Sequence, residues 1–171
     1  MVESLAGLIQ AAGGAAAAAQ WQEAERLWAQ VRARDPGNVQ ALFSLGVHAF
    51  QRGDAKGALE LLQAARARAS DDPMIAVTVS RIFRALAQPE QEWGAIIEAL
   101  AIDAYFVPGL LAKAEFLERQ GRTRVAAAAF RDVLKVASEE SQWPPTLRRR
   151  LEHARDMARE DTEELAAYLS H

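Results

Sequence analysis

The chain has 171 residues, of which 50% are apolar and 25% are charged, and its formal net charge is −3 at pH 7. This length suits one domain, and a slightly acidic chain creates no field that would attract nucleic acid, so we expect no nucleic-acid partner. Because the sequence contains no cysteine, disulfides and thiolate chemistry are excluded.

Residues 1–20 form an apolar, alanine-rich opening segment. It carries Glu3 and no basic residue ahead of its apolar run, and Gly13-Gly14 interrupts that run. A signal peptide needs a basic flank, and a membrane span needs about twenty nearly unbroken apolar residues. We therefore expect neither a signal peptide nor a membrane partner, and we place the chain in the cytoplasm.

The sequence repeats with a period of 34 residues, in units 5–38, 39–72, 73–106 and 107–140. Within each unit the eighth position is small, the twentieth is small in three of the four units, and the twenty-fourth is large and apolar. The residues at these three positions are Ala12, Gly46, Ser80 and Ala114; Ala24, Ala58, Glu92 and Ala126; and Trp28, Leu62, Ile96 and Phe130. Small residues let two antiparallel helices approach closely, so each unit is predicted to be a helical hairpin. Such a hairpin cannot bury its apolar face alone, which predicts a stacked solenoid.

The register also places the helices. We expect pairs at about 3–18 and 21–34, 39–52 and 55–69, 73–87 and 89–102, and 107–120 and 123–138. Gly53 and Gly121 fall at the turn inside a hairpin, where glycine suits the left-handed residue that follows a helix C-terminus. Pro36 and Pro73 suit a turn or a first helical position between units.

A ninth helix is predicted at about 145–169. Pro144-Pro145 can open it, and apolar residues then recur at helical spacing: Leu147, Leu151, Ala154, Ala158, Leu165 and Leu169. Its first half should cap the exposed edge of the last hairpin. Its second half should extend beyond the solenoid, because ~24 residues at 1.5 Å each reach about 36 Å.

Three arginines, Arg148, Arg149 and Arg150, stand in the first turn of this helix. The helix dipole disfavours cations there, so something other than local helix stability selects them. They form either a solvated face or a docking patch for an acidic partner.

The repeat pattern resembles the tetratricopeptide repeat family. The resemblance also rests on Leu8, Leu42, Ala76 and Leu110 at the fourth position, on Val31, Ala65, Ala99 and Val133 at the twenty-seventh, and on the inter-unit turn Asp35-Pro36-Gly37-Asn38. It implies a single all-α domain over residues 1–171, built as a right-handed solenoid of four hairpins with a C-terminal capping helix. It also implies that the chain binds a protein or a peptide in a concave groove.

Residues 147–169, which follow this divergent array, resemble a segment of bacterial aspartyl/asparaginyl β-hydroxylase-type proteins. In those proteins the segment joins the N-terminal repeat region to the catalytic domain. The resemblance implies the front region of an iron(II)- and 2-oxoglutarate-dependent oxygenase, with a β-rich catalytic domain downstream in the same polypeptide. The alternative is a free-standing adaptor that binds a peptide in its groove.

No residue of the chain itself argues for catalysis, for a cofactor or for a metal. His48, His153 and His171 stand in different helices, without a second ligand at metal-binding spacing. His48 falls in a polar stripe with Gln40, Ser44 and Gln51, which predicts a surface histidine. The sequence also lacks the glycine motifs of phosphate loops, nucleophile elbows and dinucleotide-binding turns.

In this architecture the first helix of each hairpin lines the concave surface. The candidate binding residues are Gln40, Phe43, Val47, Phe50 and Gln51 in the second unit; Met74, Val77, Arg81 and Arg84 in the third; and Leu111, Glu115, Glu118 and Arg119 in the fourth. Phe43, Val47 and Phe50 lie within about 60° on a helical wheel and form one apolar stripe. They either anchor a bound peptide or pack against the neighbouring first helix, whose facing residues have almost no side chain.

The rest of this surface is charged. Because identical positions of adjacent repeats are neighbours, Arg81 should face Glu115 and Arg84 should face Glu118. Each such pair is worth about 0–1 kcal/mol when exposed. Alternatively, the two arginines bind the carboxylates of an acidic peptide in two-point contacts.

Two segments depart from the repeat pattern. Glu92 occupies a position that favours alanine, so helix 89–102 is expected to be rotated or shifted, with Trp93 repacked beside it. Ala11 to Ala19 is small on every face, whereas a terminal helix needs a polar outer face. That open face predicts a weak homodimer, or a contact with the rest of a longer protein.

Overall fold

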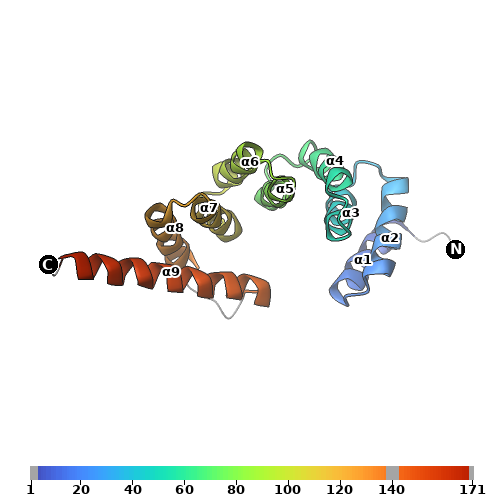
Figure 1. Ribbon diagram of the computed structural model, residues 1–171. Coiled ribbons are helices and arrows are strands. Elements are labelled where there is room, and N and C mark those ends of the chain that lie inside the picture. The colour runs from blue at the N-terminus through green and yellow to red at the C-terminus, as the bar shows by residue number, and fades with distance from the viewer. Residues whose placement is uncertain (1–3, 138–142, 170–171) are drawn as a thin grey trace. The chain divides into compact units, whose positions relative to one another are not determined.

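The computed structural model describes residues 4–137 and 143–169, and within these ranges all regular secondary structure is helical (Figure 1). The helices of the described ranges are α1 (Leu5–Ala17), α2 (Trp21–Arg34), α3 (Val39–Gln51), α4 (Ala55–Arg66), α5 (Pro73–Ala85), α6 (Pro89–Ile102), α7 (Val107–Arg119), α8 (Thr123–Val136) and α9 (Pro145–Leu169). The predicted all-α class is confirmed. The first helix of each hairpin ends one or two residues before the expected position.

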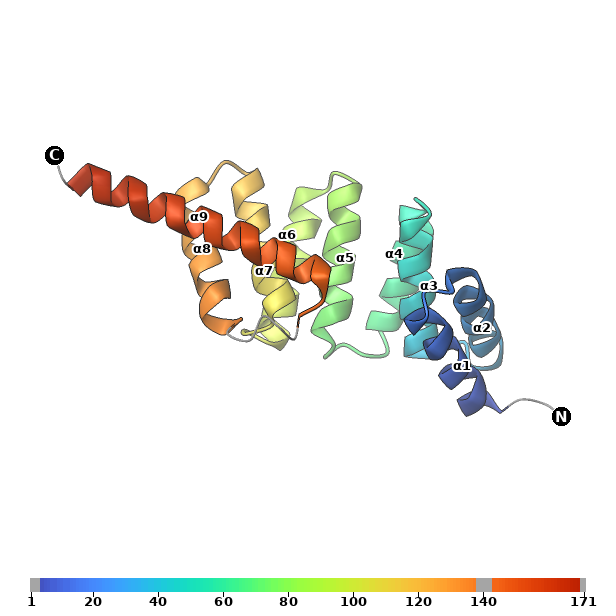
Figure 2. The ribbon, with the colours of Figure 1, turned by 90° about the horizontal axis from the view of Figure 1, so that it is seen from below.

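The chain divides into two compact units, which we call unit 1 (Met1–Glu92) and unit 2 (Trp93–His171), and the boundary falls inside α6. In unit 1, α1 packs against α2 and α3 against α4, while α2 and α4 each contact the first helix of the next hairpin. In unit 2, α7 packs against α8, and α8 against α9. Figure 2 shows the two helices of each of these hairpins lying side by side. The assignment of the whole chain to one domain stays a prediction.

The small and large positions of the repeat are buried as predicted. In the second hairpin Ala58 and Leu62 of α4 are buried against Gly46 of α3. A Cβ atom added to Gly46 would lie only 2.9 Å from Cγ of Leu62, so the two helices approach too closely for a larger residue. Glu92, at the position that favours alanine, is buried too. Trp93 lies beside Phe116, with ring centroids 5.1 Å apart, and the expected rotation of helix 89–102 stays a prediction.

All four hairpins turn through the same backbone motif. The fifteenth residue of every unit has a positive φ, namely Ala19 at 56°, Gly53 at 86°, Ala87 at 53° and Gly121 at 71°. In each turn the N–H of this residue donates to the carbonyl three residues earlier, and the next N–H donates to the carbonyl five residues earlier. This pair of hydrogen bonds is the Schellman motif, which ends a helix and satisfies its last carbonyls. The glycine turns were predicted, whereas alanine gave no such signal at Ala19 and Ala87.

The turn between the first two hairpins is held by side chains. Asp35 accepts hydrogen bonds from the backbone N–H of Gly37 and from the amide of Asn38, both at 3.2 Å. Asn38 in turn caps α3 by accepting from the N–H of Ala41 at 3.1 Å. Asp72 caps α5 in the same way, through the N–H of Met74 at 2.8 Å. Both α3 and α5 therefore begin next to a residue whose side chain satisfies an otherwise unpaired amide.

The prediction that His48 lies at the surface is wrong, because only 7% of its surface is exposed. Its ring stands edge-on to Trp21 of α2, with centroids 6.0 Å apart, and its Nδ1 has no hydrogen-bond partner among the described residues. Desolvation lowers the pKa of His48 below its ordinary value, and the nearby Arg52 adds to this shift while Glu25 opposes it. The folded protein therefore favours neutral His48.

The left-handed turns predict opposite effects for exchanges between alanine and glycine. Gly53→Ala should lower the free energy of unfolding by about 1 kcal/mol, because a Cβ atom is strained at positive φ. Ala19→Gly should not lower the free energy of unfolding, since relief of the same strain offsets the greater entropy of glycine in the unfolded chain. The control is Ala18→Gly, one residue earlier at a φ of −83°, which should destabilise the protein. Urea unfolding measures all three, and a loss at Ala19→Gly as large as at Ala18→Gly would contradict the strain.

Burial of neutral His48 predicts a pH dependence of stability. The unfolded chain protonates His48 below about pH 6.5, whereas the folded chain resists protonation. The free energy of unfolding should therefore fall as the pH drops from about 6.5, until His48 also protonates in the folded protein. His48→Phe removes this contribution. Between about pH 7.5 and pH 5, urea unfolding should therefore show a smaller loss of the free energy of unfolding in the variant than in the wild type. Equal losses would show that His48 does not carry the effect.

Candidate binding surfaces

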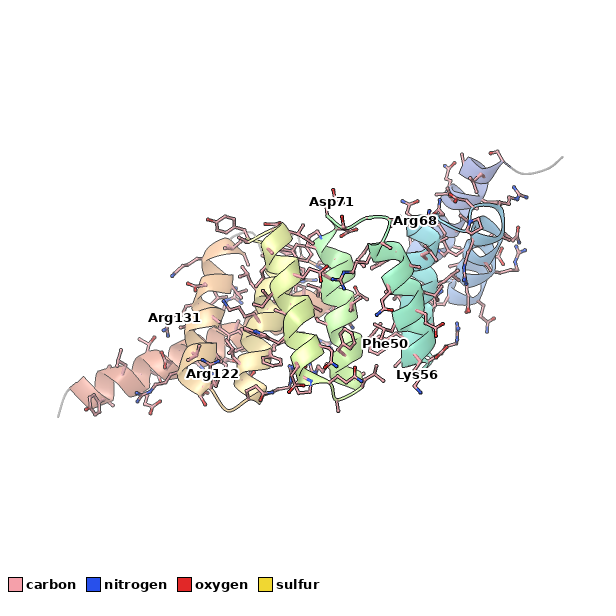
Figure 3. The ribbon with its side chains drawn as sticks, turned by 90° about the horizontal axis from the view of Figure 1, so that it is seen from above. Phe50, Lys56, Arg68, Asp71, Arg122 and Arg131 are labelled. Atoms are coloured by element: carbon pink, nitrogen blue, oxygen red, sulfur yellow. The ribbon has the colours of Figure 1, made fainter. Side chains whose placement is uncertain are left out.

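The apolar stripe predicted on the second hairpin is partly open. Phe43, Val47 and Phe50 of α3 are half-buried, while Gln40 and Gln51 at its two ends are exposed. Figure 3 shows Phe50 on the side of the α3–α4 hairpin that is nearer to α5. This stripe, formed by Phe43, Val47 and Phe50, is named the α3 stripe below. Met74, the candidate at the start of α5, is also exposed.

Two other candidates for the concave surface belong to the core. Val77 is only 4% exposed and Leu111 is fully buried, so neither can contact a ligand directly. Leu111 belongs to the apolar cluster that also contains Phe130 of α8 and Leu147 and Leu151 of α9. Val77 lies in α5, which buries consecutive residues from Ile75 to Ser80 and therefore has little open surface there.

The glutamates of α7 are bound by α9 within unit 2. Arg150 donates from Nε to Oε1 of Glu115 at 2.6 Å, and Nε2 of His153 lies 3.0 Å from both carboxylate oxygens of Glu118. In each pair the two residues are 35 residues apart in sequence, which is one repeat plus one residue. The first half of α9 therefore takes the place that the first helix of a further repeat would occupy.

The ion pairs predicted between the third and fourth repeats would join Arg81 to Glu115 and Arg84 to Glu118. They span the two units and stay predictions. Within unit 2, the guanidinium carbon of Arg119 lies 5.7 Å from the ring centroid of Phe116, which suits a cation–π contact.

The three arginines at the start of α9 have different surroundings. Arg148 and Arg149 are exposed, whereas Arg150 is half-buried beside Glu115. Farther along α9, Asp161 accepts a hydrogen bond from Arg131 of α8 at 2.5 Å. The predicted patch for an acidic partner is thus partly used to dock α9 on its own unit.

A groove that the sequence did not predict lies between α2, α3 and α4. It has a volume of about 560 Å³, and its apolar lining includes Leu45, Ala49 and Leu61. Arg52 donates to Glu25 at one end, and Arg32 lies at the other. Its residues come from three helices and from repeat positions outside the concave set, so no single helical stripe marks it. We name it the α2–α4 groove.

The outer face of α1 is open. A Cβ atom added at Gly13 or Gly14 would meet no atom outside its own helix within 4 Å. Association through this face stays a prediction, because small side chains alone offer little apolar area.

Metal sites and membrane spans are both absent from the described part of the chain. Across these residues, no three histidine, aspartate or glutamate side chains are grouped where they could hold a metal ion. None of the described helices combines the length and the apolar character that a bilayer crossing requires.

The tetratricopeptide repeat family model matches residues 8–73. A search of curated proteins finds no match. Among solved structures, the chain is similar to a MamA protein at 16% identity and a TM-score of 0.68, covering 98% of this chain and 97% of that one. It is also similar to TTC0263, a thermophilic tetratricopeptide repeat protein of Thermus thermophilus, at 16% identity and a TM-score of 0.73, covering 88% of this chain and 81% of that one.

A third similar structure is the Cut9–Hcn1 hetero-tetramer of the APC/C, at 15% identity and a TM-score of 0.77. The match covers 92% of this chain and 30% of that one. At these identities the structural likeness shows the fold alone. Together with the family match to residues 8–73 and the repeated hairpins, it supports a tetratricopeptide-like helical fold.

Proposed function

We propose that this chain is a protein-interaction module that binds a peptide or a short helix through the α3 stripe. The observation that carries the proposal is the partial exposure of Phe43, Val47 and Phe50 on one face of α3. They lie within residues 8–73, the segment that matches the repeat family. Half-buried aromatic and branched side chains that share one helix face are typical anchors for the apolar side chains of a ligand.

The surroundings of the stripe define the chemistry of the ligand. Gln40 and Gln51 are exposed at the two ends of α3 and can each donate and accept hydrogen bonds, as backbone amides of a peptide require. Arg81 of α5 is also exposed and can bind a carboxylate. The corresponding surface of α7 differs, because Glu115 and Glu118 are already bound by α9. The favoured ligand is therefore an apolar peptide with one acidic residue, bound on unit 1.

The competing interpretation is that the α3 stripe only packs against α1. Selection of a random peptide library on the purified chain, followed by fluorescence anisotropy with a selected peptide, separates the two. Val47→Asp should raise the dissociation constant at least about tenfold while the protein stays folded, because a charge in the stripe opposes an apolar anchor. The matched control is Ala64→Asp, at an exposed position of α4, which should leave the dissociation constant within about twofold.

Two results would contradict a binding role for the stripe. One is equal affinity of the selected peptide for wild type and Val47→Asp. The other is a large loss of stability in Phe50→Ala, of about 3–5 kcal/mol as at a fully buried phenylalanine, without any loss of peptide binding.

We further propose that the chain is the front region of a longer iron(II)- and 2-oxoglutarate-dependent oxygenase. The support is the resemblance of residues 147–169 to the connecting segment of the hydroxylase-type proteins. No group of the described residues fits an iron ion, so iron would belong to another part of the polypeptide. The free-standing adaptor is the alternative, and the full open reading frame distinguishes the two.

Elemental analysis and a 2-oxoglutarate assay of the purified chain test whether iron binding and catalysis belong to another part of the polypeptide. We expect no stoichiometric iron or zinc, because three suitable ligands are not grouped among the described residues. We also expect no consumption of 2-oxoglutarate. Stoichiometric metal together with uncoupled 2-oxoglutarate consumption would contradict the assignment of iron binding and catalysis to another part of the polypeptide.

A further inference from the structure

A titratable side chain is buried where the first two hairpins meet. His48 of α3 is 7% exposed, and its ring stands edge-on to Trp21 of α2, with centroids 6.0 Å apart. Because α2 and α3 belong to successive hairpins, this contact joins the first hairpin to the second. In the part of the chain that the structure describes, Nδ1 of His48 is buried and has no hydrogen-bond partner. The junction of the two hairpins therefore contains a histidine that is held by packing and not by a hydrogen bond at this nitrogen.

A proton on His48 is incompatible with this packing. In neutral histidine one ring nitrogen is an acceptor, whereas in the imidazolium both nitrogens carry a proton and act as donors. Nδ1 would then be a buried donor without an acceptor, on a ring that also carries a charge. Burial of an unpaired charge costs much more than burial of an unpaired neutral group. The imidazolium is therefore more stable in water, outside the contact between α2 and α3.

The charges around His48 do not compensate for this burial. Glu25 of α2 favours a proton on His48, and Arg52, one turn farther along α3, disfavours it. Arg52 also donates to Glu25, so the two charges largely cancel. Desolvation is the largest effect, and it lowers the pKa of His48. The other charged residues of the helices that pack near His48 are exposed or half-buried: Glu23 and Arg26 of α2; Lys56, Glu60 and Arg66 of α4; and Arg81 and Arg84 of α5.

The α3 stripe is carried by the same helix as His48. Val47 and His48 are consecutive, so their side chains leave α3 about 100° apart. His48 faces α2, whereas Phe50 lies on the side of the α3–α4 hairpin that is nearer to α5 (Figure 3). A movement of α3 that brings His48 into water therefore also moves Val47, and with it Phe43 and Phe50. The position of the stripe depends on the contact that His48 makes with α2.

We infer that a proton on His48 weakens the contact between α2 and α3 and thereby weakens ligand binding at the α3 stripe. The inference rests on the proposed function of the stripe. Proton and ligand then oppose each other, because the ligand binds the arrangement in which His48 is neutral. Such coupling is reciprocal: the ligand lowers the affinity of His48 for a proton by the same factor by which the proton lowers the affinity for the ligand.

The dissociation constant of a histidine-free peptide, selected on the chain at pH 7.5 and measured by fluorescence anisotropy, tests the inference. Between about pH 7.5 and pH 5 it should rise at least about threefold in the wild type. His48→Phe keeps an aromatic ring beside Trp21 but takes up no proton, so its dissociation constant should stay nearly constant. The matched control, His153→Gln on α9 of unit 2, should behave like the wild type. Circular dichroism at each pH confirms that the proteins are folded.

A titration of the His48 imidazole by nuclear magnetic resonance measures the same coupling from the other side. Saturation with the peptide should lower the pKa of His48 by at least about half a unit, which corresponds to the threefold change in affinity. An equal pH dependence of binding in the wild type and in His48→Phe would overturn the inference and leave the binding role of the stripe intact. So would a His48 pKa that the peptide does not change. Absence of peptide binding at pH 7.5 would contradict the proposed function itself, and the inference with it.

Discussion

The close approach of two helices within one hairpin is the constraint on which the other features depend. In the second hairpin, Gly46 leaves no room for a side chain next to Leu62. Because the same small and large positions recur with a 34-residue period, each unit can form such a hairpin. Stacking then creates two kinds of surface: the faces of first helices, such as the α3 stripe, and the grooves between second helices, such as the α2–α4 groove.

The sequence predicts those features that depend on residues at a fixed spacing in one helix or turn. The helix pairs, the start of α5 at Pro73 and the glycine turns at Gly53 and Gly121 all belong to this class. It did not predict the burial of His48, because burial depends on Trp21 from another helix. Nor did it predict the α2–α4 groove, whose lining comes from three helices. Of the candidate site, the stripe was predictable from helical spacing, whereas the burial of Val77 and Leu111 was not.

The C-terminal helix adds ion pairs that the sequence did not predict. Within unit 2, the cations that bind Glu115 and Glu118 lie one repeat plus one residue later in the chain. The 34-residue period predicted partners for these glutamates only in the preceding repeat, because residues after 140 fall outside the four units. Because α9 already binds these carboxylates within unit 2, the contacts support the proposal that a ligand binds on unit 1.

The alternation of alanine and glycine at the hairpin turns has a consequence for local dynamics. Ala19 and Ala87 hold a left-handed backbone that alanine adopts reluctantly, whereas Gly53 and Gly121 adopt it without strain. Local opening of a helix end releases such strain, so the C-terminal ends of α1 and α5 should fray more readily than those of α3 and α7. Amide hydrogen exchange would then be faster at the turns of the first and third hairpins than at those of the second and fourth. The free energy of local opening would therefore alternate from one hairpin turn to the next.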